Sequence, residues 1–173
     1  PLCGACGLFQ DCQSPKIPIA GKGKLGVLVI GEGPGATEDQ RNLPFVGKAG
    51  QRLRKALRRI NVDLDEDCWT TNSIICRAWE PNSTNFDGTA NRPPTEKEIA
   101  FCRPNILKAI DTLKPKVIIL LGRHAIRSVI GHLWRDAPGE VERWVGWRVP
   151  CQVTNAWICP TYHPSHVMRR EES

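Results

Sequence analysis

Long hydrophobic runs are missing from this chain of 173 residues, whose longest continuous apolar stretch, Val117–Leu121, has five residues. A membrane-spanning helix needs about 20 such residues, and no basic segment followed by an apolar one, the mark of a secretory leader, precedes the first cysteines. We therefore expect a soluble protein with no membrane contact. A chain of this size buries about 70% of its unfolded surface, so we expect one domain over residues 1–173. Its start at Pro1 and its charged final residues lead us to expect a piece of a longer polypeptide.

Eight cysteines have two interpretations, disulfides in a secreted protein or metal-binding thiols in a reducing compartment. We favour reduced thiols, because no leader is seen and the chain is long enough to fold without cross-links. Cys3 and Cys6 form a C-x-x-C pair, and Cys76 and Cys102 are placed to complete a set of four. Four thiolates suit structural zinc or an iron–sulfur cluster, and spacing does not choose between them. Cys12 is able to replace one ligand, and the cysteines expected to be buried thiols are Cys68, Cys151 and Cys159.

Short apolar runs alternate with helical patterns, which indicates an α/β protein. Strands are expected over Val27–Ile30, Trp69–Cys76, Val117–Leu121 and Val149–Ile158. Helices are expected over 49–60, from a capping box at Thr95 and Glu98 to Pro115, and over Arg123–Ile130.

Four polar or glycine positions follow the expected strands: Glu32, Asn72, Gly122 and His163. Right-handed crossovers bring the loops after parallel strands to one edge of the sheet, where open α/β sheets bind ligands. The sequence therefore predicts a site at this edge.

The loop after the first strand is rich in glycine, with the sequence Gly31-Glu32-Gly33-Pro34-Gly35. Glycines let backbone amides approach a phosphate or a small ring closely, although this loop has neither Walker nor G-x-G-x-x-G spacing. A tight turn without a ligand is the other interpretation. The nearby carboxylates of Glu32, Glu38 and Asp39 are suited to hold a water molecule or a cation.

A basic stretch from Arg41 to Val62 contains seven basic residues and no acid. It is either a solvated helix face or a surface that contacts phosphates. Phe45, between the acidic loop and the basic helix expected over 49–60, is either a packing residue or a flat face on which a base stacks.

His163 and Asn72 are the other candidates. His163 follows the last expected strand, and we interpret it as functional, with Ser165, Arg169 and Arg170 behind it to meet phosphates. The amide of Asn72 offers both a donor and an acceptor, as recognition of a base edge requires, or caps the end of a strand.

Many motifs occur in one order along the chain: Cys3-Gly4-Ala5-Cys6, Gly31–Gly35, Glu38-Asp39, Pro44–Gly50, Thr71-Asn72, Cys76-Arg77, Asn91-Arg92, Pro94-Thr95, Cys102, Lys114-Pro115, Leu121-Gly122 and His163-Pro164-Ser165. Over nearly its whole length the chain thereby resembles family 4 uracil-DNA glycosylases, the iron–sulfur group. The resemblance implies a three-layer α/β/α sandwich with a central, mainly parallel four-stranded sheet. The family's final helix, after the His-Pro-Ser segment, is expected to be missing here.

The resemblance implies that Cys3, Cys6, Cys76 and Cys102 hold a structural four-iron four-sulfur cluster, with zinc as the alternative. Leu8, two residues after Cys6, matches the family pattern and favours Cys6 over Cys12.

The resemblance also implies roles in a pocket for a flipped-out deoxyuridine. Phe45 stacks on uracil, Asn72 pairs with its O4 and N3 edge, and the backbone near Gly33 approaches the ring. His163 hydrogen-bonds O2 as negative charge develops there. Either Glu32 or Glu38 holds the attacking water, and the sequence does not choose between them.

The implied partner is uracil-containing DNA, single- or double-stranded, with its phosphates gripped by Pro34, Ser165, Arg169 and Arg170. The implied activity is hydrolysis of the N-glycosidic bond, as in base excision repair, without a lyase step. A catalytically silent or modified-base-specific DNA-binding domain is the alternative. We further expect a monomer, linked to other domains of a longer chain, in the cytoplasm of a bacterium or archaeon or encoded by a phage, and associated with the nucleoid.

Overall fold

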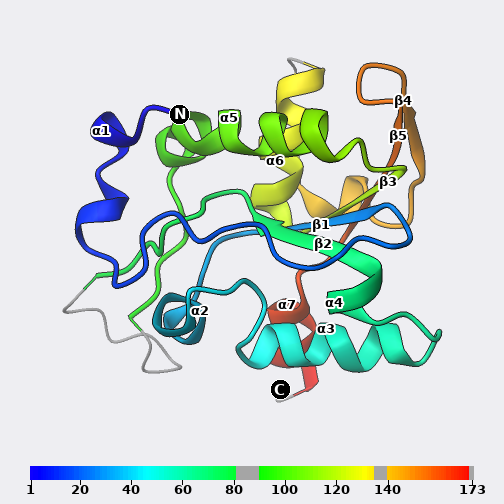
Figure 1. Cartoon of the computed structure of the whole chain (residues 1–173), viewed down its shortest axis with the longest axis horizontal. Coiled ribbons are helices and arrows are strands. Elements are labelled where there is room, and N and C mark those ends of the chain that lie inside the picture. The colour runs from blue at the N-terminus through cyan, green and yellow to red at the C-terminus, as the bar shows by residue number, and fades with distance from the viewer. Residues whose placement is uncertain (81–89, 135–139, 172–173) are drawn as a thin grey trace.

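The sheet at the centre of the molecule has five strands in the order β2-β1-β3-β5-β4 (Figure 1). The computed structural model describes residues 1–80, 90–134 and 140–171, with side chains up to residue 167. The strands are β1 (Val27–Gly31), β2 (Cys68–Asn72), β3 (Val117–Leu121), β4 (Val149–Cys151) and β5 (Ala156–Thr161). All neighbouring pairs are parallel except β4 with β5. The predicted mainly parallel sheet is confirmed, with one strand more than the four predicted.

The extra strand comes from a hairpin. The segment predicted as one strand, Val149–Ile158, folds into β4 and the start of β5, which pair antiparallel. In the turn between them Asn155 has a φ of +49°, a left-handed conformation in which asparagine is enriched. The reversal puts Pro150 in the middle of an edge strand, opposite Trp157.

The helical segments in the described residues are α1 (Cys3–Cys6), the 3₁₀ turn η1 (Leu8–Gln10), α2 (Ala36–Arg41), α3 (Lys48–Arg58), α4 (Leu64–Asp67), α5 (Glu96–Leu113), α6 (Arg123–Leu133), the 3₁₀ turn η2 (Val141–Arg143) and α7 (Pro164–Glu171). The predicted capping box at the start of α5 is present, since Thr95 Oγ1 accepts from the Glu98 amide at 3.2 Å and Glu98 Oε2 from the Thr95 amide at 2.7 Å. The expectation that no helix follows Ser165 is wrong, because α7 begins at Pro164, whose fixed φ suits a helix start. None of the described helices has the length and apolar character needed to cross a membrane.

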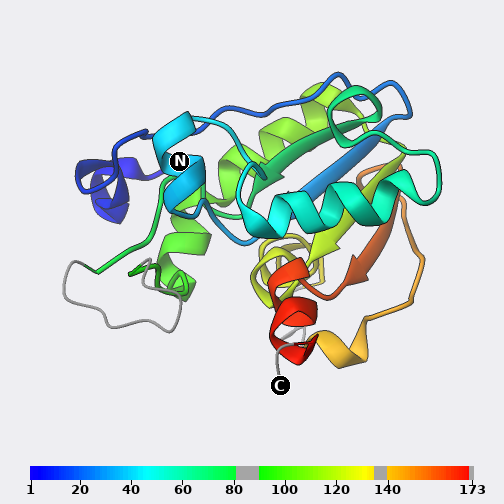
Figure 2. The same cartoon turned by 90° about the horizontal axis from the view of Figure 1, so that it is seen from below.

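Helices cover both faces of the sheet, which confirms the three-layer α/β/α sandwich. On one face α5 and α6 pack over Leu28, Ile118 and Ile158 of the strands. On the other face Leu53 and Leu57 of α3 pack on the sheet, and α7 lies beside α3 (Figure 2). The central strands β1 and β3 are apolar on both faces because both faces are covered.

The N-terminal segment wraps around one margin of this sandwich (Figure 1). Leu8 packs with Ile74 and with Ile99 of α5 in a separate small core. Further along, Ala20 pairs with Thr70 by two backbone hydrogen bonds of 3.1 and 2.8 Å at the outer side of β2. The first residues of the chain are thereby fixed to the loop after β2 and to α5.

Candidate active site

The carboxyl ends of the four parallel strands meet at one edge of the sheet. In register, the last residue of β1 pairs with Asn72, and the last residue of β3 with the last of β5. Glu32 and Gly122 directly follow β1 and β3, and His163 comes two residues after β5. The structure thus places the four predicted positions at the same edge.

Gly31, at the end of β1, brings two predicted site residues together. A Cβ atom on residue 31 would lie 2.5 Å from Asn72 Oδ1 and 2.6 Å from Phe45 Cζ. Only glycine leaves room for both side chains. Its carbonyl also accepts hydrogen bonds from the amide and the hydroxyl of Ser73, each 2.8 Å long. The buried ring of Phe45 and the buried amide of Asn72 therefore share one corner of the edge.

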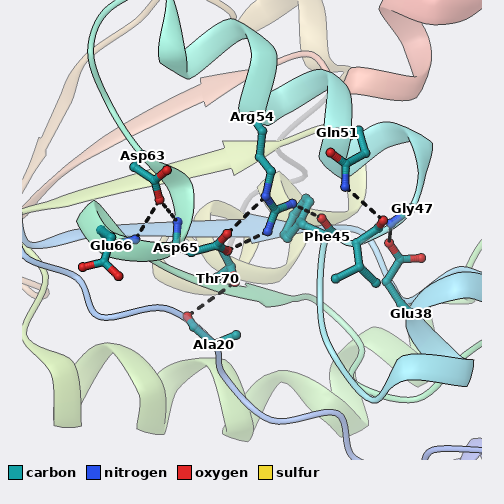
Figure 3. Close-up of polar contacts among 11 residues, drawn as sticks. Ala20, Glu38, Phe45, Gly47, Gln51, Arg54, Asp63, Asp65, Glu66 and Thr70 are labelled. Carbon is teal, nitrogen blue, oxygen red and sulfur yellow. Dashed lines mark hydrogen bonds and ion pairs between the residues drawn. The ribbon is translucent and has the colours of Figure 1, made fainter.

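Phe45 has a left-handed backbone, with a φ of +56°, which is uncommon for a bulky residue. Arg54 of α3 holds this conformation by donating to the Phe45 carbonyl, and its guanidinium also binds Asp65 Oδ1 at 2.6 Å and Oδ2 at 3.3 Å (Figure 3). A Cβ atom on Gly50 would lie 1.9 Å from the Phe45 carbonyl oxygen. The ring is therefore set by backbone contacts as well as by core packing.

Glu38 fixes the rest of the Phe45 segment, which we define as residues 45–47. One carboxylate oxygen accepts from the Gly47 amide at 2.6 Å, and the other accepts from the Gly35 amide at 3.1 Å. Gln51 donates to the Val46 carbonyl at 3.4 Å (Figure 3). Both oxygens of Glu38 are thus bound to backbone amides, and its carboxylate braces two loops.

Glu32 has a different environment. Its Oε2 lies 2.8 Å from Nδ1 of the buried His124, in the first turn of α6. The contact is not in line with the ring N–H, so it is a close polar contact rather than a linear hydrogen bond. Burial raises the pKa of the Glu32 carboxyl, but the contact and charge of His124, followed by the charges of His163 and Arg123, outweigh burial and bring this pKa below its ordinary value.

His163 is oriented by Ser165. Its Nδ1 lies 2.7 Å from Ser165 Oγ and accepts from the Ser165 amide at 3.3 Å. A neutral ring that accepts at Nδ1 carries its proton on Nε2. Gly122, with a φ of +85°, packs against this residue, since a Cβ there would lie 3.0 Å from His163 Cβ.

The other predicted residues have mixed placements. Pro34 is buried, and a Cβ on Gly33 would lie 2.8 Å from Ile74 Cγ1, so packing alone requires a glycine there. Asp39 binds the N-terminal segment and does not belong to the site at the sheet edge, because its carboxylate accepts hydrogen bonds from the Gln13 and Ser14 amides at 3.1 and 2.8 Å. The predicted phosphate ligands Arg169 and Arg170 have side chains outside the described residues.

The four predicted cysteine ligands, Cys3, Cys6, Cys76 and Cys102, line a single, otherwise mainly apolar cavity between the N-terminal segment and α5. Burial raises the pKa of Cys76 to about 12 and also raises that of Cys102. Amide groups point at both sulfurs, from the Lys16 backbone at 3.3 Å and from Asn105 Nδ2 at 3.4 Å. Cys12 packs beside this group but does not line the cavity. In the described part of the chain, no three His, Cys, Asp or Glu residues are grouped so as to hold a metal ion.

Comparison with known proteins decides the family. Residues 18–173 match the uracil DNA glycosylase superfamily. The chain belongs to this superfamily. It is 37% identical to a type-4 uracil-DNA glycosylase of Pyrobaculum aerophilum, over 97% of this chain and 80% of that protein. It is 32% identical to type-4 uracil-DNA glycosylases of Saccharolobus solfataricus and Sulfurisphaera tokodaii, over 94% of this chain and 71% and 70% of those proteins. The predicted relationship to family 4 and the predicted enzyme class are confirmed.

The basic stretch of this glycosylase is only partly a solvent-facing surface. Five of its basic residues are exposed, namely Arg41, Lys48, Lys55, Arg58 and Arg59. Arg54 is turned inward to the Phe45 carbonyl, a role that charge counting does not reveal.

His124 is the site residue that sequence reasoning missed. The rule that selected Glu32 and His163 also applies to it, since it stands three residues after the end of β3. Its position at the start of a helix with an apolar pattern concealed it.

Proposed function

We propose that the protein hydrolyses the N-glycosidic bond of deoxyuridine in DNA, which releases uracil and leaves an abasic site. The observation that carries the proposal is the placement of an aromatic ring, an amide, a carboxylate and an imidazole at one sheet edge, in a chain of this superfamily. The target nucleotide must leave the duplex to reach this edge.

Base recognition falls to Phe45 and Asn72. Uracil stacks on the Phe45 ring, whose position the contacts of Arg54, Gln51 and Glu38 to the Phe45 segment support. Asn72 accepts from uracil N3–H and donates to O4, which uses both functions of its amide. The backbone near Gly33 approaches the ring from the glycine-rich loop.

Leaving-group stabilisation falls to His163. As the bond from C1′ to N1 breaks, the electron pair leaves with uracil and negative charge develops on O2. The Ser165 amide donates to Nδ1, which leaves the ring proton on Nε2, and this N–H donates a hydrogen bond to O2.

Glu32, and not Glu38, holds the attacking water. Both oxygens of Glu38 accept backbone amides, whereas Glu32 is ionised at neutral pH and its side chain is 34% exposed. The water oxygen bonds to C1′, its proton passes to the carboxylate, and the carboxylate's charge faces the positive sugar. No lyase step follows.

The DNA backbone is bound by Ser165, Arg169 and Arg170 together with the exposed basic residues of 41–59, whereas the buried Pro34 is not one of its ligands. These contacts do not depend on base sequence and weaken with salt.

Cys3, Cys6, Cys76 and Cys102 would hold a four-iron four-sulfur cluster. The four thiols that line one cavity and the amide groups aimed at two of their sulfurs support this assignment. The group is structural: it ties the N-terminal segment to the loop after β2 and to α5.

The activity is tested by incubating anaerobically purified protein with single-stranded and mismatched oligonucleotides that carry one uracil, and by measuring free base. The His163→Ala variant is compared with His132→Ala, an exposed histidine of α6. We expect uracil release by the wild type and the His132 variant and its loss in the His163 variant. Binding without release would contradict the proposal and favour the DNA-binding domain, or a modified base such as hydroxymethyluracil.

The cluster is tested by iron and acid-labile sulfide content. Cys76→Ser and Cys102→Ser are expected to lose both, and Cys159→Ser on β5 is expected to keep them. Zinc without sulfide in the wild type would identify the alternative metal.

A further inference from the structure

His124 is a buried side chain with an unexplained polar atom. It is 5% exposed and lies in the first turn of α6, two residues after the N-cap Gly122. Its Nδ1 has no in-line hydrogen-bond partner among the described residues, although buried polar atoms in native proteins nearly always have one. Packing alone does not require a histidine at this position.

Glu32 lies opposite this nitrogen. Its Oε2 is 2.8 Å from His124 Nδ1, and its side chain is 34% exposed where that of His124 is 7% exposed. Within the residues that the structure describes, Glu32 Oε1 has no hydrogen-bonded protein partner. The carboxylate therefore has Oε2 in contact with His124, whereas Oε1 has no partner among the described residues and the side chain is partly exposed.

The charged groups acting on Glu32 come from two elements. His124 and Arg123 belong to the start of α6, and His163 belongs to the loop after β5. Of these, only His124 touches the carboxylate. Catalytic bases are commonly held by a third group that fixes their orientation.

We propose that His124 is a positioning residue of the glycosylase reaction: it holds Glu32 Oε2 so that Oε1 faces the water that attacks C1′. This inference rests on the proposed function. In this arrangement His163 stabilises the leaving base, and His124 orients the carboxylate that directs the water.

The test compares three variants of the full chain with its cofactor. His124→Leu removes the contact, His124→Asn keeps a donor near the place of Nδ1, and His132→Leu is the matched control on the exposed side of the same helix. The readouts are the single-turnover rate of uracil release, the KM, the pH profile and the titration of the Glu32 carboxyl followed by NMR.

We expect His124→Leu to slow the release step by about tenfold to hundredfold, less than the ~10²–10⁴ that a general base supplies, with little change in KM. The contact lowers the pKa of Glu32, so its loss raises that pKa and moves the acid limb of the rate profile to higher pH. His124→Asn should recover most of the rate, and His132→Leu should match the wild type.

The inference is overturned if the Glu32 titration is the same in His124→Leu and in wild type, or if both His124 variants keep the full rate and an unmoved acid limb. If His124→Leu does not fold, the Asn variant decides, because loss of rate there together with an unmoved Glu32 titration contradicts positioning. If the wild type releases no uracil, the proposed function fails, and the NMR titration still decides the contact.

Discussion

The Phe45 segment and the Glu32 turn lie at the same sheet edge but are held in different ways. Arg54, Gln51 and Glu38 bind the backbone of the Phe45 segment at three successive residues. Among the described residues, His124 is the one side chain in contact with the Glu32 carboxylate, and the Glu32 side chain is 34% exposed. A stacking surface works when it is rigid before the base arrives, whereas a carboxylate that activates water must keep an accessible oxygen.

The largest expected effect separates the two carboxylates. Glu32→Gln should lower the rate of uracil release by roughly 10²–10⁴-fold, since the charge that holds the water is lost, while the melting temperature stays near that of the wild type. Single-turnover assays and thermal melting measure both. A wild-type rate in Glu32→Gln would show that the Glu32 carboxylate does not activate the water, and the proposed difference between the Glu32 turn and the Phe45 segment would be wrong.

Glu38→Ala should act mainly on stability. It leaves the Gly35 and Gly47 amides without their acceptor, at a cost of about 1–3 kcal/mol, and the rate should fall less than in Glu32→Gln. Urea unfolding checks the stability, with Glu142→Ala, an exposed carboxylate of η2, as the control. A larger loss of rate than in Glu32→Gln, with stability unchanged, would reverse the assignment of roles.

Arg54→Ala should have a smaller effect on stability, about 1–2 kcal/mol, from the Phe45 carbonyl that loses its donor. It should also raise KM, because the left-handed backbone beneath the stacking ring is less firmly held. Asp65→Asn is the matched control, since the Asp65 side chain is 59% exposed and its ion pair with Arg54 is expected to contribute about 0–1 kcal/mol. Equal effects of the two substitutions would mean that the ion pair, and not the carbonyl contact, matters.

The smallest expected effect concerns pH. Activity needs Glu32 ionised and falls as the pH drops through its pKa, which lies below the ordinary value of 4.5. The acid limb of the wild-type profile should therefore lie below pH 4.5, and Glu38→Ala should not move it. An acid limb above that pH in the wild type would contradict the environment described for Glu32.

The sequence predicted the parts of this molecule that follow from the spacing of apolar residues, from helix-capping motifs and from the topology of parallel sheets. The buried runs at β1 and β3, the capping box of α5 and the meeting of Glu32, Asn72 and His163 at one edge all follow from such rules. The hairpin was missed because Asn155, with no glycine beside it, is a weak turn signal. The proposed division of roles between Glu32 and Glu38 depends on where two loops meet in space, and residue spacing along the chain does not reveal this.

Both margins of the sheet carry features that oppose further strand pairing. At β4 the edge strand has three residues with Pro150 at its centre, which has no N–H to offer, and at β2 Ala20 already occupies Thr70. Exposed edges are the usual starting points for strand addition between copies of a protein. At high concentration this glycosylase should thus remain dispersed and resist fibrillar aggregation. The site at the carboxyl ends of the strands then stays available for DNA.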